Sequence, residues 1–212
     1  MSGLLTNKNS VMMKESVAEI IKNVLKAVYQ PFLFALVLSV FVLFFLMFIE
    51  KYNKVSIKDK IVMAFKEWKD KFLSQKKFRR AFYLVFFSVM VLFKTLLNRD
   101  MWANPVSDVI GVWGLHRKDG TFTTEMFENV VLFIPLVFFL FFFLETTSKR
   151  TSKFLIIMGK SMAFSFLISL TIEMLQLFLR LGTWQLSDIC FNLIGGIIGG
   201  LIYWLTAKIR RI

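Results

Sequence analysis

The side chains that could bind or transform a ligand gather in the C-terminal half of the chain. Five polar residues recur there at steps of four, four, three and four: Ser165, Ser169, Glu173, Gln176 and Arg180. These steps place all five on one face of a helix. The helical rise puts Glu173 near one boundary of a membrane's hydrocarbon core. Ionisable groups in that position indicate a functional site with paired charges.

The next apolar segment continues this polar surface. Ser187 is the expected N-cap of a helix, and Asp188 falls in its first turn, where the helix dipole favours an anion. Asn192 follows Asp188 by four residues and shares its face. Two overlapping GxxxG spacings let another helix approach closely: Gly195 with Gly199, and Gly196 with Gly200. These glycines can pack within the chain or against another copy of it.

Polar groups elsewhere in the chain are expected at the same boundary. The predicted ligand-binding residues are Arg99, Asn104, Asn129, Glu173, Gln176, Arg180, Asp188 and Asn192. Lys94 lies near the same boundary and would add a further base. Arginine would hold anionic head groups through bidentate contacts, and the amides would orient them. The structural alternative is that Glu173 pairs with Arg180, Lys94 or Arg99 and simply locks the helices together.

Composition defines the class of protein that must position these residues. Hydrophobic residues make up 57% of the 212 residues, and 26 are Phe, which is too apolar for a soluble domain of this size. We predict an all-α integral membrane protein, a bundle of about five transmembrane helices with an N-terminal amphipathic helix and an amphipathic cytoplasmic loop helix. The expected spans are 32–49, 81–97, 130–144, 154–176 and 188–207.

Two segments outside these spans are amphipathic. Residues 11–28 place apolar side chains on one face, which predicts an interfacial helix, with a sixth span as the alternative. In the 50–80 loop, apolar residues recur at helical spacing: Ile57, Ile61, Phe65, Trp68 and Phe72. Its lysines would lie against anionic lipid head groups. The chain has no nucleic-acid-binding motif, so we predict no nucleic-acid partner.

The distribution of the net charge of +13 predicts the topology. The 50–80 loop holds eleven Lys and Arg against four acids, whereas the 98–128 loop holds three against five. The positive-inside rule therefore places the N-terminus outside and the C-terminus in the cytoplasm. The predicted organisation is an N-terminal amphipathic segment (1–30), a first span with its basic loop (31–80), a four-helix membrane domain (81–207) and a basic cytoplasmic tail (208–212).

Metal and nucleophile chemistry have little support in the sequence. The single Cys190 excludes an internal disulfide and a cysteine-based zinc site, and it is expected in the core. His116 is the single histidine, in a glycine-rich loop where a solvated side chain is expected. We predict no metal and no cofactor. An intramembrane enzyme acting on a lipid or sugar-lipid, with Glu173 and Asp188 as acid and base, is the alternative to a binding protein.

Three motifs in this order resemble the VanZ-like family of bacterial membrane proteins, over about 80–207. They are Asn129-x3-Phe133-Ile134-Pro135-Leu136, Glu173-x2-Gln176-x3-Arg180 and Asp188-x3-Asn192-x2-Gly195-Gly196. Val137 stands where the family usually has glycine.

The resemblance implies a multi-pass protein of the bacterial cytoplasmic membrane, in the cell envelope of a Gram-positive organism. It implies a contribution to low-level resistance to lipoglycopeptide antibiotics such as teicoplanin. With the polar residues above, it predicts that the protein binds or reorganises lipid-linked ligands at the outer membrane boundary. The expected partners are membrane lipids, lipid-linked cell-wall intermediates or a lipoglycopeptide, and a second copy of the chain.

Overall fold

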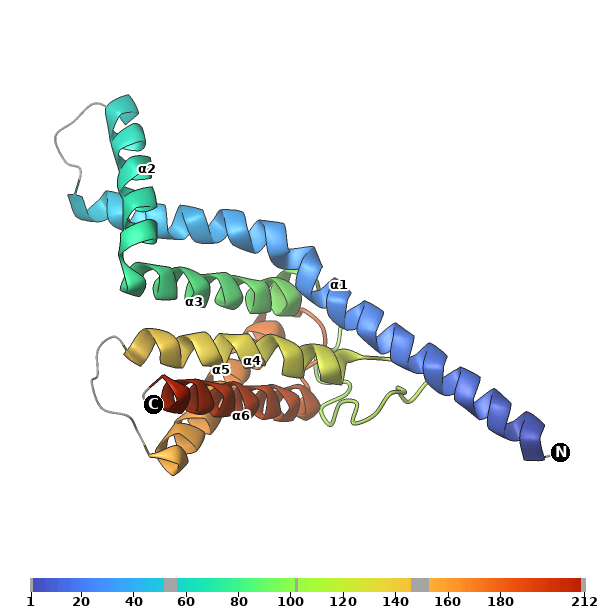
Figure 1. The fold of residues 1–212 in the computed structure, drawn as a ribbon. Helices are drawn as coiled ribbons and strands as arrows, with labels where there is room; N and C mark the ends of the chain where they lie inside the picture. The colour runs from blue at the N-terminus through green and yellow to red at the C-terminus, as the bar shows by residue number, and fades with distance from the viewer. Residues whose placement is uncertain (1, 52–56, 102, 146–152, 211–212) are drawn as a thin grey trace.

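The computed structural model describes residues 2–51, 57–101, 103–145 and 153–210. Within these residues the regular structure is helical, with six α-helices and a π-helical turn that extends the third (Figure 1). In chain order they are α1 (Ser2–Lys51), α2 (Ile57–Ser74), α3 (Lys76–Leu92), η1 (Phe93–Leu97), α4 (Glu125–Leu144), α5 (Phe154–Leu179) and α6 (Leu186–Ile209).

Five of these helical segments are long and apolar enough to cross a membrane. The candidate spans among the described residues are Met13–Met47, Lys76–Leu97, Glu125–Leu144, Phe154–Leu179 and Leu186–Ile209. The predicted all-α membrane architecture and its five spans are thereby confirmed. Figure 1 shows the C-terminus and α2 at one end of the bundle and the loop between η1 and α4 at the other. We call the latter the loop-side end.

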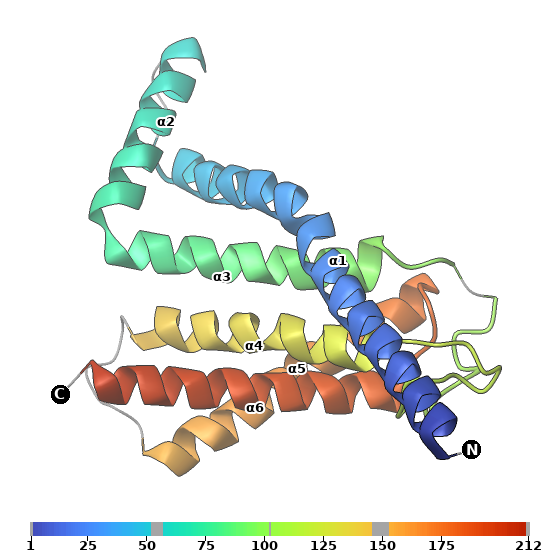
Figure 2. The ribbon, with the colours of Figure 1, turned by 45° about the vertical axis from the view of Figure 1, so that its right-hand side comes forward.

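The N-terminal segment differs in one respect from its prediction as a separate amphipathic helix. Residues 11–28 are the first part of α1, which continues through Pro31 into the apolar run. A proline inside a helix removes one backbone hydrogen bond and bends the helix without ending it when packing supports both sides. Phe32 provides such packing, with its ring centroid 5.3 Å from that of Phe86. Figure 2 shows the resulting change of direction along α1.

The basic loop forms α2, as its apolar spacing predicts, and packs against α3 through aromatic rings. The Trp68 ring meets Phe78 and Phe82 edge-on at 5.8 and 6.0 Å, and Phe72 meets Phe82 at 5.2 Å. Phe65 is exposed. The side chains of Ile57 and Ile61 lie outside the described residues. One part of the apolar face of α2 therefore packs against α3, and another part is exposed.

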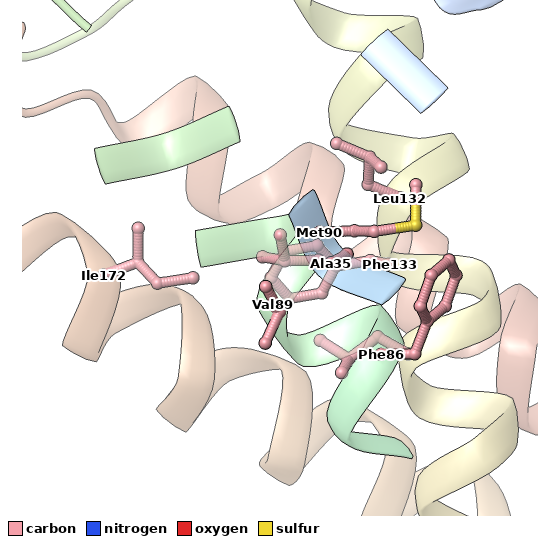
Figure 3. Packing of buried hydrophobic residues seen from close by; sticks show 9 residues of the cluster. Ala35, Phe86, Val89, Met90, Leu132, Phe133 and Ile172 are labelled. Carbon is pink, nitrogen blue, oxygen red and sulfur yellow. The ribbon is translucent and has the colours of Figure 1, made fainter. Parts of the chain in front are cut away.

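The core of the loop-side half joins α1, α3, α4 and α5. Met90, Phe133 and Leu136 are almost fully buried there, together with Ala35 of α1 and Ile172 of α5 (Figure 3). This apolar contact fixes the helix ends that carry the polar residues.

Close backbone approach places α6 against both α4 and α5. A Cβ at Gly195 would overlap the carbonyl of Val130, and one at Gly199 would overlap that of Ile134. On the neighbouring face, Gly196 and Gly200 leave room for two serine side chains of α5: Ser165 and Ser161. The two GxxxG spacings thus pack within the chain.

Candidate functional site

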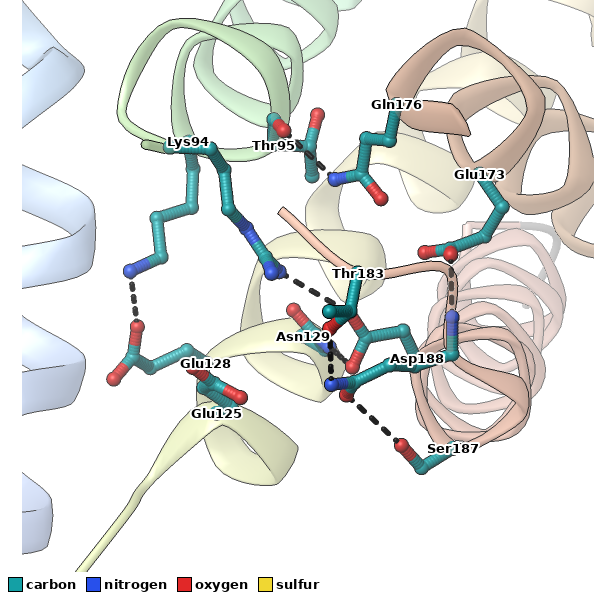
Figure 4. Close-up of polar contacts among 12 residues, drawn as sticks. Lys94, Thr95, Glu125, Glu128, Asn129, Glu173, Gln176, Thr183, Ser187 and Asp188 are labelled. Carbon is teal, nitrogen blue, oxygen red and sulfur yellow. Dashed lines mark hydrogen bonds and ion pairs between the residues drawn. The ribbon is translucent and has the colours of Figure 1, made fainter. Parts of the chain in front are cut away.

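Asp188 joins three elements at the loop-side end. It lies in the first turn of α6, and its side chain is 6% exposed. One carboxylate oxygen accepts a hydrogen bond from Arg99 Nη2 at 3.1 Å, and the other accepts one from Asn129 Nδ2 at 2.9 Å (Figure 4). These two hydrogen bonds hold the carboxylate in place at the N-terminal end of α6. A buried ion pair therefore links α6 to Arg99, two residues after η1, and a hydrogen bond links α6 to α4.

The Arg99 guanidinium keeps its charge despite its burial. Burial alone would lower the pKa of Arg99, but the carboxylates of Asp188, Glu125 and Glu173 outweigh it and raise the pKa above its usual value. Gly182 makes room for this side chain, because a Cβ there would lie 3.2 Å from Arg99 Nη1 and the residue has a φ of +78°. Arg99 is thus a fixed cation at the edge of the bundle.

Three further polar residues tie α5 to its neighbours. Glu173, 1% exposed, accepts a 2.9 Å hydrogen bond from the backbone N–H of Gln185, the N-cap residue of α6. Gln176 Nε2 donates to the carbonyl of Thr95 in η1 at 2.7 Å. Asn192 Nδ2 donates to the hydroxyl of Ser169 at 2.8 Å. The predicted polar faces of α5 and α6 therefore meet in the structure.

A second ion pair joins η1 to α4. Lys94 Nζ lies 2.6 Å from a carboxylate oxygen of Glu128 (Figure 4). The hydroxyl of Thr124 donates to the other oxygen at 2.7 Å. Sequence reasoning missed Glu128, although an acidic residue in the first turn of a membrane helix was a usable signal. Lys94, expected to contact a ligand head group, is therefore already paired.

Two predicted ligand-binding residues lie outside this network. Arg180 ends α5 with a left-handed φ of 56°, and the N–H groups of Arg180 and Leu181 donate to the carbonyls of Leu177 and Gln176 in a Schellman arrangement. Its side chain is exposed, whereas Glu173 on the same helix is buried. Asn104 is also exposed, and its side-chain oxygen accepts from the backbone N–H of Val106 within a turn.

Ser187 is not the N-cap of α6. The helix begins at Leu186, and the backbone of the η1–α4 loop supplies the acceptors for its first N–H groups. Leu186 donates to the carbonyl of Val109 at 2.9 Å, and Ser187 donates to that of Ile110 at 3.3 Å. Gly111, with a φ of +75°, packs directly on the Ser187 hydroxyl. Backbone carbonyls therefore do here what a capping side chain was predicted to do.

A polar cavity of about 450 Å³ opens at the loop-side end, above the Arg99–Asp188 pair. Its lining includes charged side chains of both signs: Arg99, Asp100, Asp108, Arg117, Lys118, Asp119 and Glu125. Glu173 and Asp188 do not line it. The carboxylates of the enzyme alternative are therefore held by structural hydrogen bonds beneath the cavity.

Most of the cavity's charges are already paired. Arg117 and Glu125 lie 2.6 Å apart, and Lys118 and Asp108 lie 2.7 Å apart. The Asp119 carboxylate accepts hydrogen bonds from the hydroxyl and N–H of Thr121. These two bonds lower the pKa of Asp119.

An apolar groove of about 310 Å³ lies between α3 and α5, in the loop-side half of the bundle. Apart from Ser88 and Thr171 its lining is aliphatic, and both hydroxyls donate to carbonyls of their own helix. The groove reaches Leu92 on α3 and Leu175 on α5. The Thr95–Gln176 hydrogen bond comes next along both helices, and Arg99 and Gly182 of the polar cavity follow. The cavity therefore follows the groove along the same two parts of the chain: α3 with η1 and the residues after it, and α5 with the turn after it.

The remaining chemically reactive residues lie apart from this network. His116 is exposed and faces the ring of Phe122, and Cys190 is a half-buried free thiol in α6. Among the described residues, no group of His, Cys, Asp and Glu side chains is arranged to hold a metal ion.

The fold and the site define a multi-pass helical membrane protein with a buried ion-pair network beneath a polar cavity. Residues 32–207 match the VanZ/LLP1 family, and the chain belongs to this family. The match includes the second part of α1 and α2, which the motifs over about 80–207 left out. Protein VanZ of Enterococcus faecium is 29% identical over 136 residues, which cover 60% of this chain and 73% of that protein. No solved structure matches the chain.

Proposed function

We propose that this protein binds a lipid-linked ligand at its loop-side end, with the head group in the polar cavity and the hydrocarbon chain in the apolar groove. The observation that carries the proposal is the succession of the two sites along α3 and α5, with the Thr95–Gln176 hydrogen bond between them. A lipid has a matching arrangement, because its polar head group is joined directly to its hydrocarbon chains.

The buried network supports a binding role because it fixes the cavity floor. Arg99 is held by Asp188, which is itself held by Asn129, so the guanidinium loses little further freedom when a ligand binds. Gly182, Thr183 and Gln185 line the same cavity beside Arg99. A pre-organised donor and acceptor set of this kind provides orientation, while the groove provides apolar contact.

The cellular role we propose follows from the family. By binding or reorganising lipid-linked ligands, such as cell-wall intermediates or the lipoglycopeptide itself, the protein would contribute to low-level resistance to lipoglycopeptide antibiotics such as teicoplanin. Family membership and the similarity to Protein VanZ support this role.

A groove-filling substitution tests the proposal. Leu92→Trp places a large ring in the groove from an exposed position, and Leu155→Trp makes the same change on an exposed part of α5 outside the groove. We expect Leu92→Trp to lower both the lipid that co-purifies with the full chain, measured by mass spectrometry, and the teicoplanin protection of cells that express it. Leu155→Trp should change neither. Equal behaviour of the two variants would refute the proposed groove.

We also propose the orientation, with the loop-side end outside the bacterial cytoplasmic membrane and α2 in the cytoplasm. The excess of Lys and Arg in the 50–80 segment supports it. After replacement of Cys190, single cysteines at Ser107 and Ser74 report the two sides. A membrane-impermeant thiol reagent should label the cysteine at 107 in intact cells and leave the one at 74 unlabelled. The reverse labelling would contradict this orientation.

A further inference from the structure

The charged side chains that line the polar cavity differ in whether they already have a partner. The pairs Arg117–Glu125 and Lys118–Asp108 use their charges on each other. Asp100 is different, because its side chain is exposed at the cavity and its carboxylate has no hydrogen-bond or ion-pair partner among the described residues. An ionised carboxylate accepts hydrogen bonds only, so this residue selects a ligand that carries a donor.

The neighbouring Arg99 carries only hydrogen-bond donors, so it selects a ligand with acceptors. Only its Nη2 atom is engaged with Asp188 among the described residues, and the guanidinium carries five N–H donors in all. Nη1 lies beside Gly182, which also lines the cavity. A guanidinium held in this way suits the planar, bidentate recognition of a phosphate.

The charge balance of the cavity decides what kind of phosphate ligand fits. Three cationic side chains line it against four acidic ones, a net lining charge of −1. A head group that carries only negative charge would approach Asp100, which has no charged partner among the described residues, as a like charge. A head group that carries phosphate and a nearby cation satisfies Arg99 and Asp100 together. The two residues are consecutive and line the same cavity, so one ligand can reach both.

We infer that the cavity selects a lipid head group that contains both a phosphate and a primary ammonium group, with the phosphate on Arg99 and the ammonium on Asp100. This inference rests on the proposed lipid-binding function and names the ligand class for it. The ammonium must be a hydrogen-bond donor, because the acceptor on Asp100 is a bare carboxylate. Trimethylation would remove all of its N–H groups.

Three phospholipids with identical acyl chains separate these requirements. Binding of phosphatidylethanolamine, phosphatidylcholine and phosphatidylglycerol to the full chain in micelles is measured by native mass spectrometry. We expect phosphatidylethanolamine to bind about tenfold more tightly than either other lipid, the effect of one charge-assisted hydrogen bond. Asp100→Asn should remove this preference. Asp70→Asn, which removes an exposed carboxylate from α2, should preserve it.

The outcomes separate this inference from the function on which it rests. Equal binding of the three lipids would overturn the head-group selection and leave lipid binding intact, whereas binding of none would overturn both. Retention of the preference in Asp100→Asn would refute the role of Asp100. Soluble phosphoethanolamine distinguishes the source of the head group. Failure to compete at lipid concentrations supports a membrane lipid, and competition equal to that of the lipid would overturn it.

Discussion

Removing both charges of the Arg99–Asp188 pair should destabilise the bundle by less than the sum of the two single removals. Arg99→Gln leaves the Asp188 carboxylate buried with Asn129 as its remaining partner, and Asp188→Asn leaves the guanidinium buried. Loss of one member of a buried ion pair costs about 3 to 5 kcal/mol, because the other charge remains away from water. The double variant buries two neutral polar groups instead.

The geometry sets the size of the coupling. At 3.1 Å and an effective dielectric constant of about 20, the attraction between the two charges is about 5 kcal/mol. The side chains are 17% and 6% exposed, so water screens part of this attraction. We expect a coupling energy of about 2 to 3 kcal/mol, within the range measured for close charge pairs. The double variant should therefore cost about 2 to 3 kcal/mol less than the sum of the single ones.

A double-mutant cycle measures this coupling. The free energy of unfolding is obtained from denaturing-detergent titrations of the full chain in mixed micelles, followed by tryptophan fluorescence. The pair Arg117–Glu125 provides the control, because it has the same chemistry but its arginine side chain is 48% exposed. Its coupling should stay below about 1 kcal/mol. Additive costs at Arg99 and Asp188, within about 0.5 kcal/mol, would refute the buried ion pair as the link between α6 and the segment after η1.

Two further substitutions test the packing and the second ion pair. Gly195→Ala should destabilise the chain by about 1 to 3 kcal/mol in the same titration, because its Cβ would overlap the backbone of α4. Gly159→Ala, at an open helical position, should be neutral or stabilising, and equal effects at both sites would contradict close α4–α6 packing. Lys94→Met should cost about 3 kcal/mol by leaving Glu128 unpaired, and restoration by a second change, Glu128→Gln, checks that the loss is electrostatic.

Helical periodicity was sufficient to predict the faces that meet at the site. Steps of three and four placed Glu173 and Gln176 on one surface of α5, and Asp188 and Asn192 on one surface of α6. Both faces are buried in the structure. The five spans could also be predicted, because long apolar runs leave the chain few alternatives in a membrane.

Partners and helix ends could not be predicted from periodicity. Arg180 continues the numerical spacing of α5, but the helix ends at this residue in a left-handed conformation and its side chain is exposed. The contact between Lys94 and Glu128 depends on how η1 sits against α4, and no local pattern contains that relation. The capping of α6 by backbone carbonyls of a distant loop could not be predicted either, because it uses no particular side chain.

The long sequence separation within the Arg99–Asp188 pair has a consequence for the timing of synthesis. The two residues are 89 positions apart, so at about 5 to 20 residues per second a ribosome adds Asp188 roughly 4 to 18 s after Arg99. During this interval the nascent chain carries a cation at the membrane boundary and, later, the uncovered polar face of α5. Insertion of α6 brings Asp188 to the Arg99 cation and covers the polar face of α5 in one step. An unfinished chain therefore differs from a finished one at this end by an Arg99 side chain without Asp188 and by an uncovered polar face on α5.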